Sequence, residues 1–229
     1  MDVEERFKAL LHDTLSFIKT GFREPSLEPS ETYKGHAPVD KSVNRYDPGI
    51  DEEIGRCIKC RLHERRRHAV PGTGNTTADI LFIGEGPGEQ EDIQGLPFVG
   101  KAGQLLTRML AAIDLKREDV YITNIVKCRP PGNRNPFPDE VASCLPYLQR
   151  QIEMIAPLII VCLGGPAAQA LLNSELRITA LRGQIHRVTD IPVIATYHPA
   201  AVLRFPEKYK RDVWNDLKLL RDFYRDIRS

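Results

Sequence analysis

Four apolar runs that alternate with helical stretches constrain the fold of this chain more than any other feature of its sequence. The runs are ADILFIGE, VYITNIVKC, PLIIVCLGG and PVIATYHP, and helical patterns cover residues 101–115, 138–155, 166–172 and 206–228. Strands that are apolar throughout and alternate with helices predict a parallel sheet covered on both faces. We therefore expect an α/β fold, a three-layer α/β/α sandwich around a mainly parallel four-stranded sheet. ALRGQIHRV and the following IPV are a candidate hairpin at its edge.

The first part of the chain follows a different pattern. Residues 3–22 place Phe7, Leu10, Leu11 and Ile18 on roughly one face, which predicts an amphipathic helix. The stretch after it is rich in Pro, Ser and charge and has little to bury, so it is interpreted as a flexible linker. We expect residues 1–49 to form this helix and linker, and residues 50–229 to form one globular domain. The helix either binds a protein partner or docks loosely on the domain.

Charge and hydropathy narrow the class of protein only slightly. The formal net charge of the 229 residues is +1, which argues neither for nor against a nucleic-acid partner. Only local clusters of basic residues can indicate such a partner. The N-terminus begins with acidic residues and lacks the uninterrupted apolar core of a signal peptide, so a signal peptide is not expected. No stretch reaches the roughly 18–20 apolar residues that cross a bilayer. We expect a soluble, cytoplasmic protein.

The predicted strands end in residues that are typical of binding sites. Their carboxyl ends carry Gly84 and Glu85, Asn124, Gly164 and Gly165, and His198 and Pro199. In open parallel sheets ligands bind at this edge, so these residues predict a site. The turn after the first strand, GEGPGEQEDIQGLPFVG, has the glycines of a phosphate-binding turn. Its four carboxylates would repel a phosphate, however, and they belong to Glu85, Glu89, Glu91 and Asp92.

The cysteines indicate a metal centre. CIKC supplies Cys57 and Cys60, two thiolates at the spacing of a metal knuckle, while Cys128 and Cys144 have fifteen residues between them. This spacing leaves an iron–sulfur cluster and zinc open, and the alternative for the second pair is two buried thiols. Cys162 lies within the run IIVCLGG and is expected to pack in the core.

Two basic runs lie beside these cysteines in the sequence. RLHERRRH follows the first pair, and KCRPPGNR surrounds the third cysteine. A run of charge is usually a solvated face, but two runs beside the same four thiols predict one basic patch. Such a patch suits contacts with phosphodiesters.

These motifs together resemble a known family. GEGPGEQED, PFVGKAGQLL, VYITNIVKCRPPGNR and YHPAAVLR, in this order and with the four cysteines, are similar to the type-4, iron–sulfur uracil-DNA glycosylases. The resemblance covers about residues 50–225. It implies that the domain at 50–229 is catalytic and that Cys57, Cys60, Cys128 and Cys144 hold a 4Fe–4S cluster. The acidic turn would then close over a flipped-out uracil rather than a phosphate.

The resemblance also implies roles for single residues. Glu85 and Gly86 would contact uracil near a carbonyl, Glu85 would help to position the attacking water, and Glu91 would lie near the base and hold the loop. Phe98 would stack on the ring, with a core aromatic as the alternative. Glu89 and Asp92 are interpreted as capping the turn in solvent.

Selectivity and charge stabilisation would come from the ends of the second and fourth predicted strands. The amide of Asn124 would accept from uracil N3–H and donate to O4, which cytosine cannot match. His198 would face O2 and stabilise the developing negative charge. The alternatives are an asparagine that merely ends a strand and a histidine in packing. Residues 200–204 resemble a loop that enters the minor groove, with Leu203 or Arg204 filling the gap left by the base.

The expected activity is monofunctional excision of uracil from single- or double-stranded DNA, which leaves an abasic site for base excision repair. Gly86 stands where type-1 enzymes have an aspartate, so water activation rests on Glu85 or on the substrate itself. We expect a monomer with no lyase activity. An iron–sulfur redox protein and a non-catalytic, damage-sensing DNA-binding protein are the alternatives, and neither explains the acidic turn together with Asn124 and His198.

Overall fold

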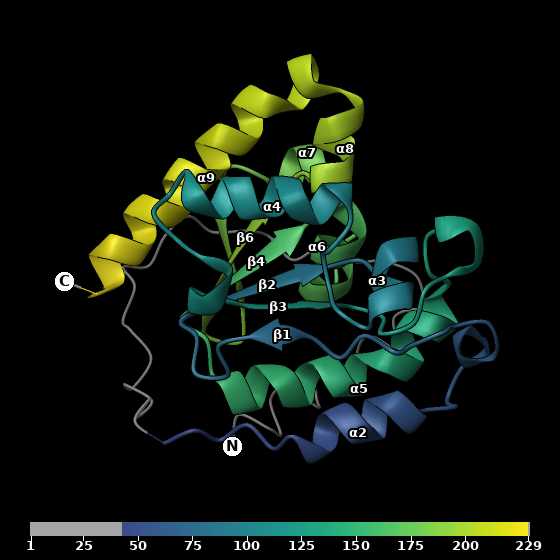
Figure 1. Cartoon of the computed structure of the whole chain (residues 1–229). Helices are drawn as coiled ribbons and strands as arrows, with labels where there is room; N and C mark the ends of the chain where they lie inside the picture. The colour runs from purple at the N-terminus through teal and green to yellow at the C-terminus, as the bar shows by residue number, and fades with distance from the viewer. Residues whose placement is uncertain (1–42, 229) are drawn as a thin grey trace.

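The computed structural model describes residues 43–228 (Figure 1), so the helix expected at residues 3–22 and most of the linker lie outside the described residues. A six-stranded sheet in the order β1-β3-β2-β4-β6-β5 forms its centre. Its strands are β1 Thr73–Gly74, β2 Ile80–Gly84, β3 Tyr121–Asn124, β4 Ile159–Leu163, β5 Ile185–Val188 and β6 Ile191–Thr196.

The four inner strands are the expected ones. β3, β2, β4 and β6 are parallel, whereas β1 and β5 pair antiparallel at the two edges. The β5–β6 pair is the candidate hairpin, and β1, with two residues, is too short to leave a pattern in the sequence. The three-layer α/β/α prediction is confirmed, with two edge strands added to the predicted four.

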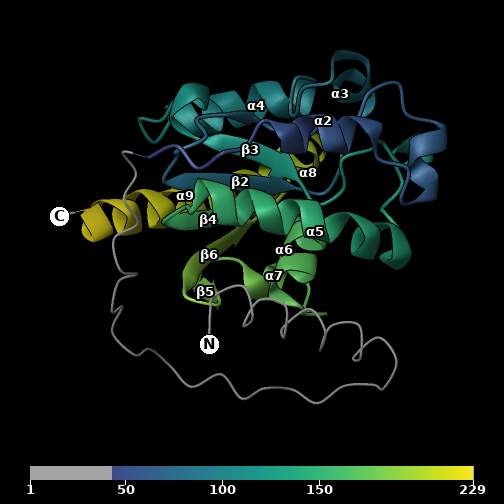
Figure 2. The same cartoon turned by 90° about the horizontal axis from the view of Figure 1, so that it is seen from below.

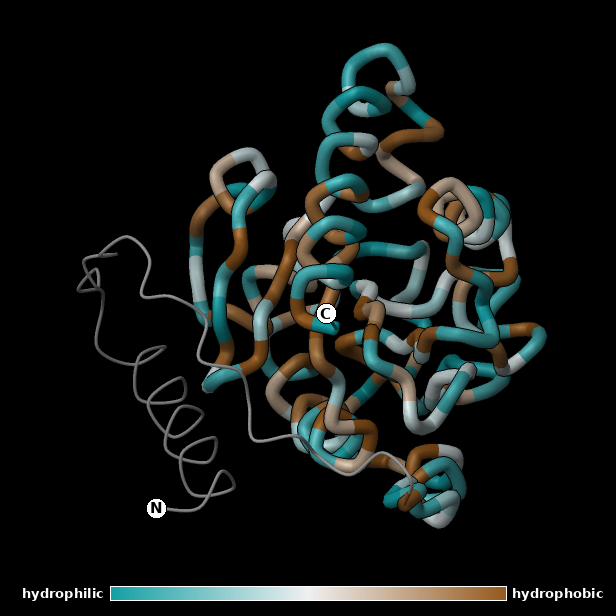
Figure 3. The backbone as a smooth tube through the Cα atoms, turned by 90° about the vertical axis from the view of Figure 1, so that its left-hand side faces the viewer, coloured by the Kyte–Doolittle hydropathy of each residue, from teal (hydrophilic) through white to brown (hydrophobic). Residues whose placement is uncertain are grey.

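Helices cover both faces of the sheet (Figure 2). One face carries α4 Lys101–Ala111, α8 Pro199–Arg204 and α9 Pro206–Arg228, and the other carries α2 Gly49–Arg56, α5 Pro138–Ile155, α6 Gly165–Leu172 and α7 Ile178–Leu181. Side chains of β2 alternate between the two cores, with Leu81 and Ile83 on the α5 side and Ile80 and Phe82 on the α4 side. Figure 3 shows hydrophobic and hydrophilic residues alternating along the outer helices, as one buried face requires.

Local chemistry sets the helix ends. α5 begins at Pro138, whose missing N–H costs nothing there, and the carboxylate of Glu140 accepts from the Phe137 N–H at 2.8 Å. α4 ends at Ala111, earlier than the 115 expected, because the chain turns through Asp114 with φ of 61°. Short helices complete the described chain: η1 Arg61–Glu64, α3 Glu89–Gln94, η2 Arg117–Asp119 and η3 Pro131–Asn133. Among the described residues no helix is long and apolar enough to cross a membrane.

Candidate active site

A cleft of about 530 Å³ opens at the carboxyl edge of the parallel strands, where the sequence predicts a site. It is lined by residues of the turn after β2, the end of β3, the 130–135 segment and the start of α8. The lining residues are Glu85, Gly86, Pro87, Gly88, Glu91, Phe98, Ala102, Asn124, Pro130, Asn133, Arg134, Asn135, His198, Ala200, Ala201 and Arg204. Six of the predicted substrate-contacting residues therefore share one cavity, and Arg204 joins them.

Asn124 presents an unsatisfied polar atom to this cleft. The residue is 1% exposed, and its Oδ1 has no hydrogen-bond partner within the described part of the chain. A buried polar atom without a partner costs about 1–3 kcal/mol, so this amide is suited to a ligand. Gly84 makes the arrangement possible, because a Cβ there would overlap Asn124 Oδ1 and lie 2.6 Å from Phe98 Cζ.

Phe98 forms one wall of the cleft in an unusual backbone conformation. Its ring centroid lies 5.6 Å from that of His198, with 33° between the planes. Its φ is 53°, in the left-handed region that residues other than glycine seldom adopt. Such strain persists where the surroundings hold it, as they do at functional sites.

His198 is arranged to act as a neutral donor. Its Nδ1 accepts a hydrogen bond from the Ala200 N–H at 3.1 Å, so the ring proton of the neutral form resides on Nε2. Burial lowers the pKa of His198 to about 4, against the opposing charge of Glu91. The imidazole is therefore uncharged at neutral pH and can donate from Nε2. Behind it, Gly164 has φ of 99° and a Cβ there would lie 3.1 Å from His198 Cβ, so the glycine turn supports the histidine instead of lining the cleft.

Glu85 and Glu91 occupy different environments in the same turn. Burial raises the pKa of Glu85, whose side chain lines the cleft. Glu91 accepts from the N–H groups of Val99 and Gly100, both at 2.8 Å, and of Gly88 at 3.1 Å. Glu91 thus fastens the turn to the segment that carries Phe98, as the family resemblance implies.

The interpretation of Asp92 as a solvent-exposed cap is wrong. Asp92 is 3% exposed, and its Oδ1 accepts from the Arg67 N–H at 2.9 Å, so it ties the turn to the basic run. The sequence could not show this, because the donor lies 25 residues away. Glu89 is exposed as expected and forms an ion pair with Arg129 at 3.6 Å.

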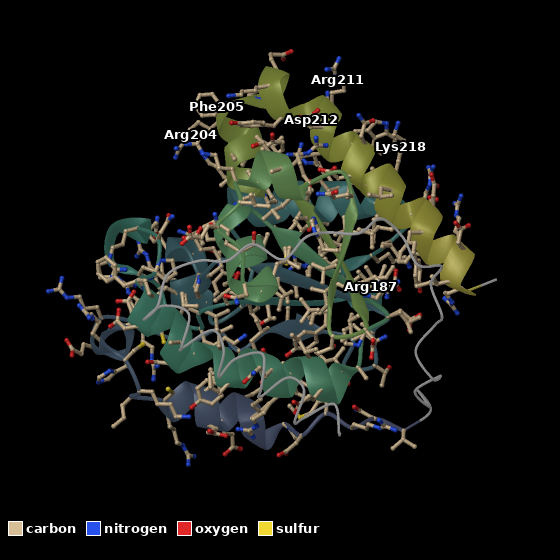
Figure 4. The ribbon with its side chains drawn as sticks, turned by 180° about the vertical axis from the view of Figure 1, so that it is seen from behind. Arg187, Arg204, Phe205, Arg211, Asp212 and Lys218 are labelled. Carbon is tan, nitrogen blue, oxygen red and sulfur yellow. The ribbon has the colours of Figure 1, made fainter. Side chains whose placement is uncertain are left out.

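Residues 200–204 are helical, which corrects their interpretation as a loop. They belong to α8, which follows directly on His198 and ends beside Phe205 (Figure 4). A helix of six residues is too short to show a periodicity in the sequence. Arg204 lines the cleft, whereas Leu203 is 44% exposed and does not.

Sequence reasoning missed the cleft wall opposite α8. Pro130, Asn133, Arg134 and Asn135 form it, and the first three belong to the run KCRPPGNR, which was interpreted as part of a basic patch and of a family motif but not as a wall of the cleft. Arg134 makes two hydrogen bonds to the buried carboxylate of Glu140, at 2.7 and 2.8 Å, and its guanidinium lies 3.7 Å from the Phe137 ring centroid. The Pro-, Gly- and Asn-rich composition of this run was the available signal for a shaped turn.

The four predicted metal ligands line a second, small cavity of about 10 Å³. Cys57, Cys60, Cys128 and Cys144 line it, together with the basic side chains of Lys59, His63, Arg66 and Lys127. Burial raises the pKa of the thiols of Cys60, Cys128 and Cys144, and neighbouring cysteines add to the effect. Cys162 is fully buried in β4, as expected of a core residue.

Several N–H groups point at these sulfurs. Arg66 Nη1 donates to Cys128 Sγ at 3.0 Å, and the backbone N–H of Lys127 donates to Cys144 Sγ at 3.3 Å. Such donors stabilise thiolates. In the described part of the chain, no three His, Cys, Asp or Glu side chains are arranged to hold a single metal ion.

An α/β/α sandwich that brings an amide and a neutral histidine from its strand ends, and an aromatic ring from the turn after β2, into one cleft is built to hold a planar, hydrogen-bonding ligand. The sequence model of the uracil DNA glycosylase superfamily matches residues 71–218, and the chain belongs to that family of enzymes.

Its relatives define the branch. A type-4 uracil-DNA glycosylase of Archaeoglobus fulgidus is 52% identical over 174 residues, which cover 71% of this chain and 87% of that protein. One of Thermotoga maritima is 44% identical over 77% of this chain and 93% of its own length. A type-5 uracil-DNA glycosylase of Pyrobaculum aerophilum is 32% identical over 57% of this chain and 65% of its own length. The resemblance to the type-4 branch is confirmed.

Proposed function

We propose that this chain removes uracil from DNA by rotating the deoxyuridine out of the base stack into the cleft and hydrolysing its N-glycosidic bond, which leaves an abasic site. One observation carries the proposal: the buried amide oxygen of Asn124, which has no hydrogen-bond partner among residues 43–228, in a cleft of base-binding size. Membership of the uracil-DNA glycosylase family supports it. Enzymes that act on a base inside DNA must extrude it in this way.

Asn124 and Phe98 recognise the base. The amide oxygen accepts from uracil N3–H and the amide nitrogen donates to O4, whereas cytosine presents the reverse pattern and leaves the buried amide unpaired. Phe98 stacks on the ring, which contributes about 1–3 kcal/mol for any base. Selectivity thus rests on Asn124 and affinity on both.

His198 and Glu85 act on the breaking bond. As C1′–N1 cleaves, its electron pair moves onto the uracil ring and O2, and the sugar becomes oxocarbenium-like. His198 donates from Nε2 to O2, which places a fixed dipole where negative charge develops. Glu85 holds the water that attacks C1′, and Gly86 lets the backbone approach the base. No lysine lines the cleft in the described part of the chain, so nothing there suits a Schiff base, and the reaction is hydrolysis alone.

α8 provides the contacts to the DNA strand. Leu203 is exposed beyond the cleft and fills the gap in the stack, while Arg204 lies at the cleft and meets a flanking phosphate. Phosphate contacts of this kind position a duplex or a single strand without reading its sequence. The enzyme acts as a monomer, and a protein partner for the N-terminal helix stays a prediction.

A 4Fe–4S cluster is held by Cys57, Cys60, Cys128 and Cys144. Their shared cavity and their N–H···S donors support this assignment. The resemblance to the type-4 branch favours a cluster over zinc, and the irregular spacing of the four cysteines along the chain is compatible with it. When bound, the cluster supplies cross-links between the basic runs. None of its ligands lines the cleft, so the chemistry of excision belongs to the strand ends.

The test uses labelled oligonucleotides that carry one U opposite G, opposite A or unpaired, beside matched T and C controls, with alkali to reveal abasic sites. We expect cleavage at U alone, none by Asn124→Ala, and a loss of about 100- to 1000-fold in His198→Ala. Asn215→Ala, on the exposed side of α9, is the control and should match the parent chain. Absence of cleavage by protein with an intact cluster would refute the proposal.

A further inference from the structure

The segment that carries Phe98 is held in a conformation it would not adopt alone. With φ of 53°, Phe98 turns its ring into the cleft between Gly84 and His198. The left-handed region is unfavourable for a residue with a Cβ, so other groups must hold the Phe98 backbone there. Two charged side chains, Glu91 and Arg117, do so from opposite sides of the backbone.

Arg117 reaches this segment from outside the cleft. It belongs to η2 and does not line the cavity, but its Nη1 donates to the Phe98 carbonyl at 3.1 Å and its Nη2 to the Pro97 carbonyl at 2.9 Å. The side chain is partly buried. Its planar guanidinium presents two donors to adjacent carbonyls at once, which an ammonium cannot do in a fixed geometry.

One peptide unit is held at both ends. The carbonyl of Phe98 accepts from Arg117, and the N–H of the same peptide, which belongs to Val99, donates to Glu91 Oε1 at 2.8 Å. A rotation of this peptide would break a charge-assisted hydrogen bond on each side. Gly103 completes the fit, because a Cβ there would overlap the Phe98 carbonyl oxygen.

We propose that Arg117 is a positioning residue for uracil binding, which fixes the peptide after Phe98 so that the aromatic ring is preorganised to stack on the base. The inference rests on the proposed function, since it requires Phe98 to contact uracil. It assigns a part in base recognition to a residue that does not line the cleft. Loss of Arg117 retains the aromatic side chain of Phe98 but frees its backbone to leave the left-handed conformation.

The experiment compares Arg117→Met and Arg117→Lys in the parent chain and in a Phe98→Leu background. Lys116→Met is the matched control, because it removes a neighbouring cation whose only described ion pair, to Glu118, lies on the surface. Steady-state excision gives KM and kcat, competition by free uracil gives Ki, and thermal unfolding gives Tm. Excision by the parent chain is measured first, so that failure of the proposed function is recognised separately.

We expect Arg117→Met to raise both KM and the uracil Ki at least tenfold in the parent chain and less than twofold in Phe98→Leu. Arg117→Lys should recover part of the loss, and Lys116→Met should change neither constant. A purely structural role would give the same fold-loss in both backgrounds, together with a lower Tm, and that result would overturn the inference. So would an unchanged Ki in a folded Arg117→Met or, should that variant fail to fold, in Arg117→Lys.

Discussion

Asn124 and Phe98 can meet in the cleft only because Gly84 has no side chain. The two functional groups come from different segments, and the space where they approach one another is the missing Cβ of a third residue. A glycine at the end of a buried strand costs backbone entropy, so its presence there indicates close approach by other groups. At the residue scale the site depends on the missing Cβ of Gly84 as much as on the side chains of Asn124 and Phe98.

Substitution of Gly84 by alanine should therefore damage function far more than folding. The new methyl group would displace both Asn124 Oδ1 and the Phe98 ring. We expect kcat/KM for uracil excision to fall by about 100-fold, because small displacements of binding groups have effects of this size. Gly55→Ala is the control: it lies inside α2, nothing lies within 4 Å of the added Cβ, and the variant should keep full activity. Equal activity of the two variants would contradict the prediction.

The neutral state of His198 predicts a pH dependence of folding. Its pKa is about 4 in the folded chain, below the ordinary 6.5, so the unfolded chain binds the extra proton between these values. The contribution to stability is fully present above pH 6.5 and is lost as the pH falls towards 4, by at most about 3 kcal/mol.

Chemical denaturation of the parent chain and of His198→Gln between pH 4 and 8 measures this term. The unfolding free energy of the parent chain should fall relative to that of His198→Gln as the pH falls, because only the parent has the histidine to protonate. A constant difference across the range would show that His198 titrates normally. The comparison cancels Glu85, whose raised pKa acts with the opposite sign.

At the scale of elements, the wall opposite α8 is attached to the first turn of α5. Glu140 is 0% exposed in its side chain; it accepts from the Phe137 N–H and from both terminal nitrogens of Arg134. One carboxylate therefore caps a helix and fixes the 130–135 segment of the cleft. The helix start and the cleft wall depend on the same group.

Glu140→Gln should loosen this wall without touching the reacting groups. A neutral amide keeps the shape of the side chain but cannot make two charge-assisted bonds to Arg134. We expect KM for uracil-containing DNA to rise roughly tenfold while kcat stays within about twofold, since lost binding that is common to ground and transition state appears in KM. Glu118→Gln, in a surface ion pair, serves as the control. A fall in kcat at constant KM would contradict this assignment.

Elements with strong local signals could be predicted from the sequence, and those defined by distant contacts could not. α5 and α9 begin at Pro138 and Pro206 as expected, because proline marks a helix start, and the four inner strands follow their apolar runs. The sequence did not predict α8, because six residues are too few to show a helical periodicity. Asp92 and Arg117 act on backbone groups 19 to 25 residues away, so nothing in the neighbouring sequence indicates their partners.

For the molecule as a whole, the segment after β3 joins the cleft to the cysteine cavity. Asn124 ends the strand, and Cys128 follows four residues later. Between them lies Lys127, fully buried, whose Nζ donates to the Asn124 carbonyl at 2.7 Å and whose backbone N–H donates to Cys144 Sγ. Order at the cysteines thus stabilises the strand end that presents the amide proposed to select uracil.

Removal of one proposed ligand should therefore weaken the fold around the cleft without altering its chemical groups. Cys144→Ala is expected to lose the visible iron–sulfur absorbance and to lower Tm, because a site assembled by folding contributes its binding energy to folding. Uracil excision should decline through a higher KM, since Asn124 and His198 are retained.

Cys162→Ala is the matched control for this experiment. It deletes a fully buried thiol from β4, so it creates a cavity but removes no proposed ligand. It should keep the absorbance and excise uracil with an unchanged KM, whatever its Tm. If Cys144→Ala retained the absorbance, or if Cys162→Ala lost it, the ligand set would be wrong. If Cys144→Ala lost the absorbance but kept its KM, order at the cysteines would not affect the cleft. The contacts of Lys127 would then not couple the two sites.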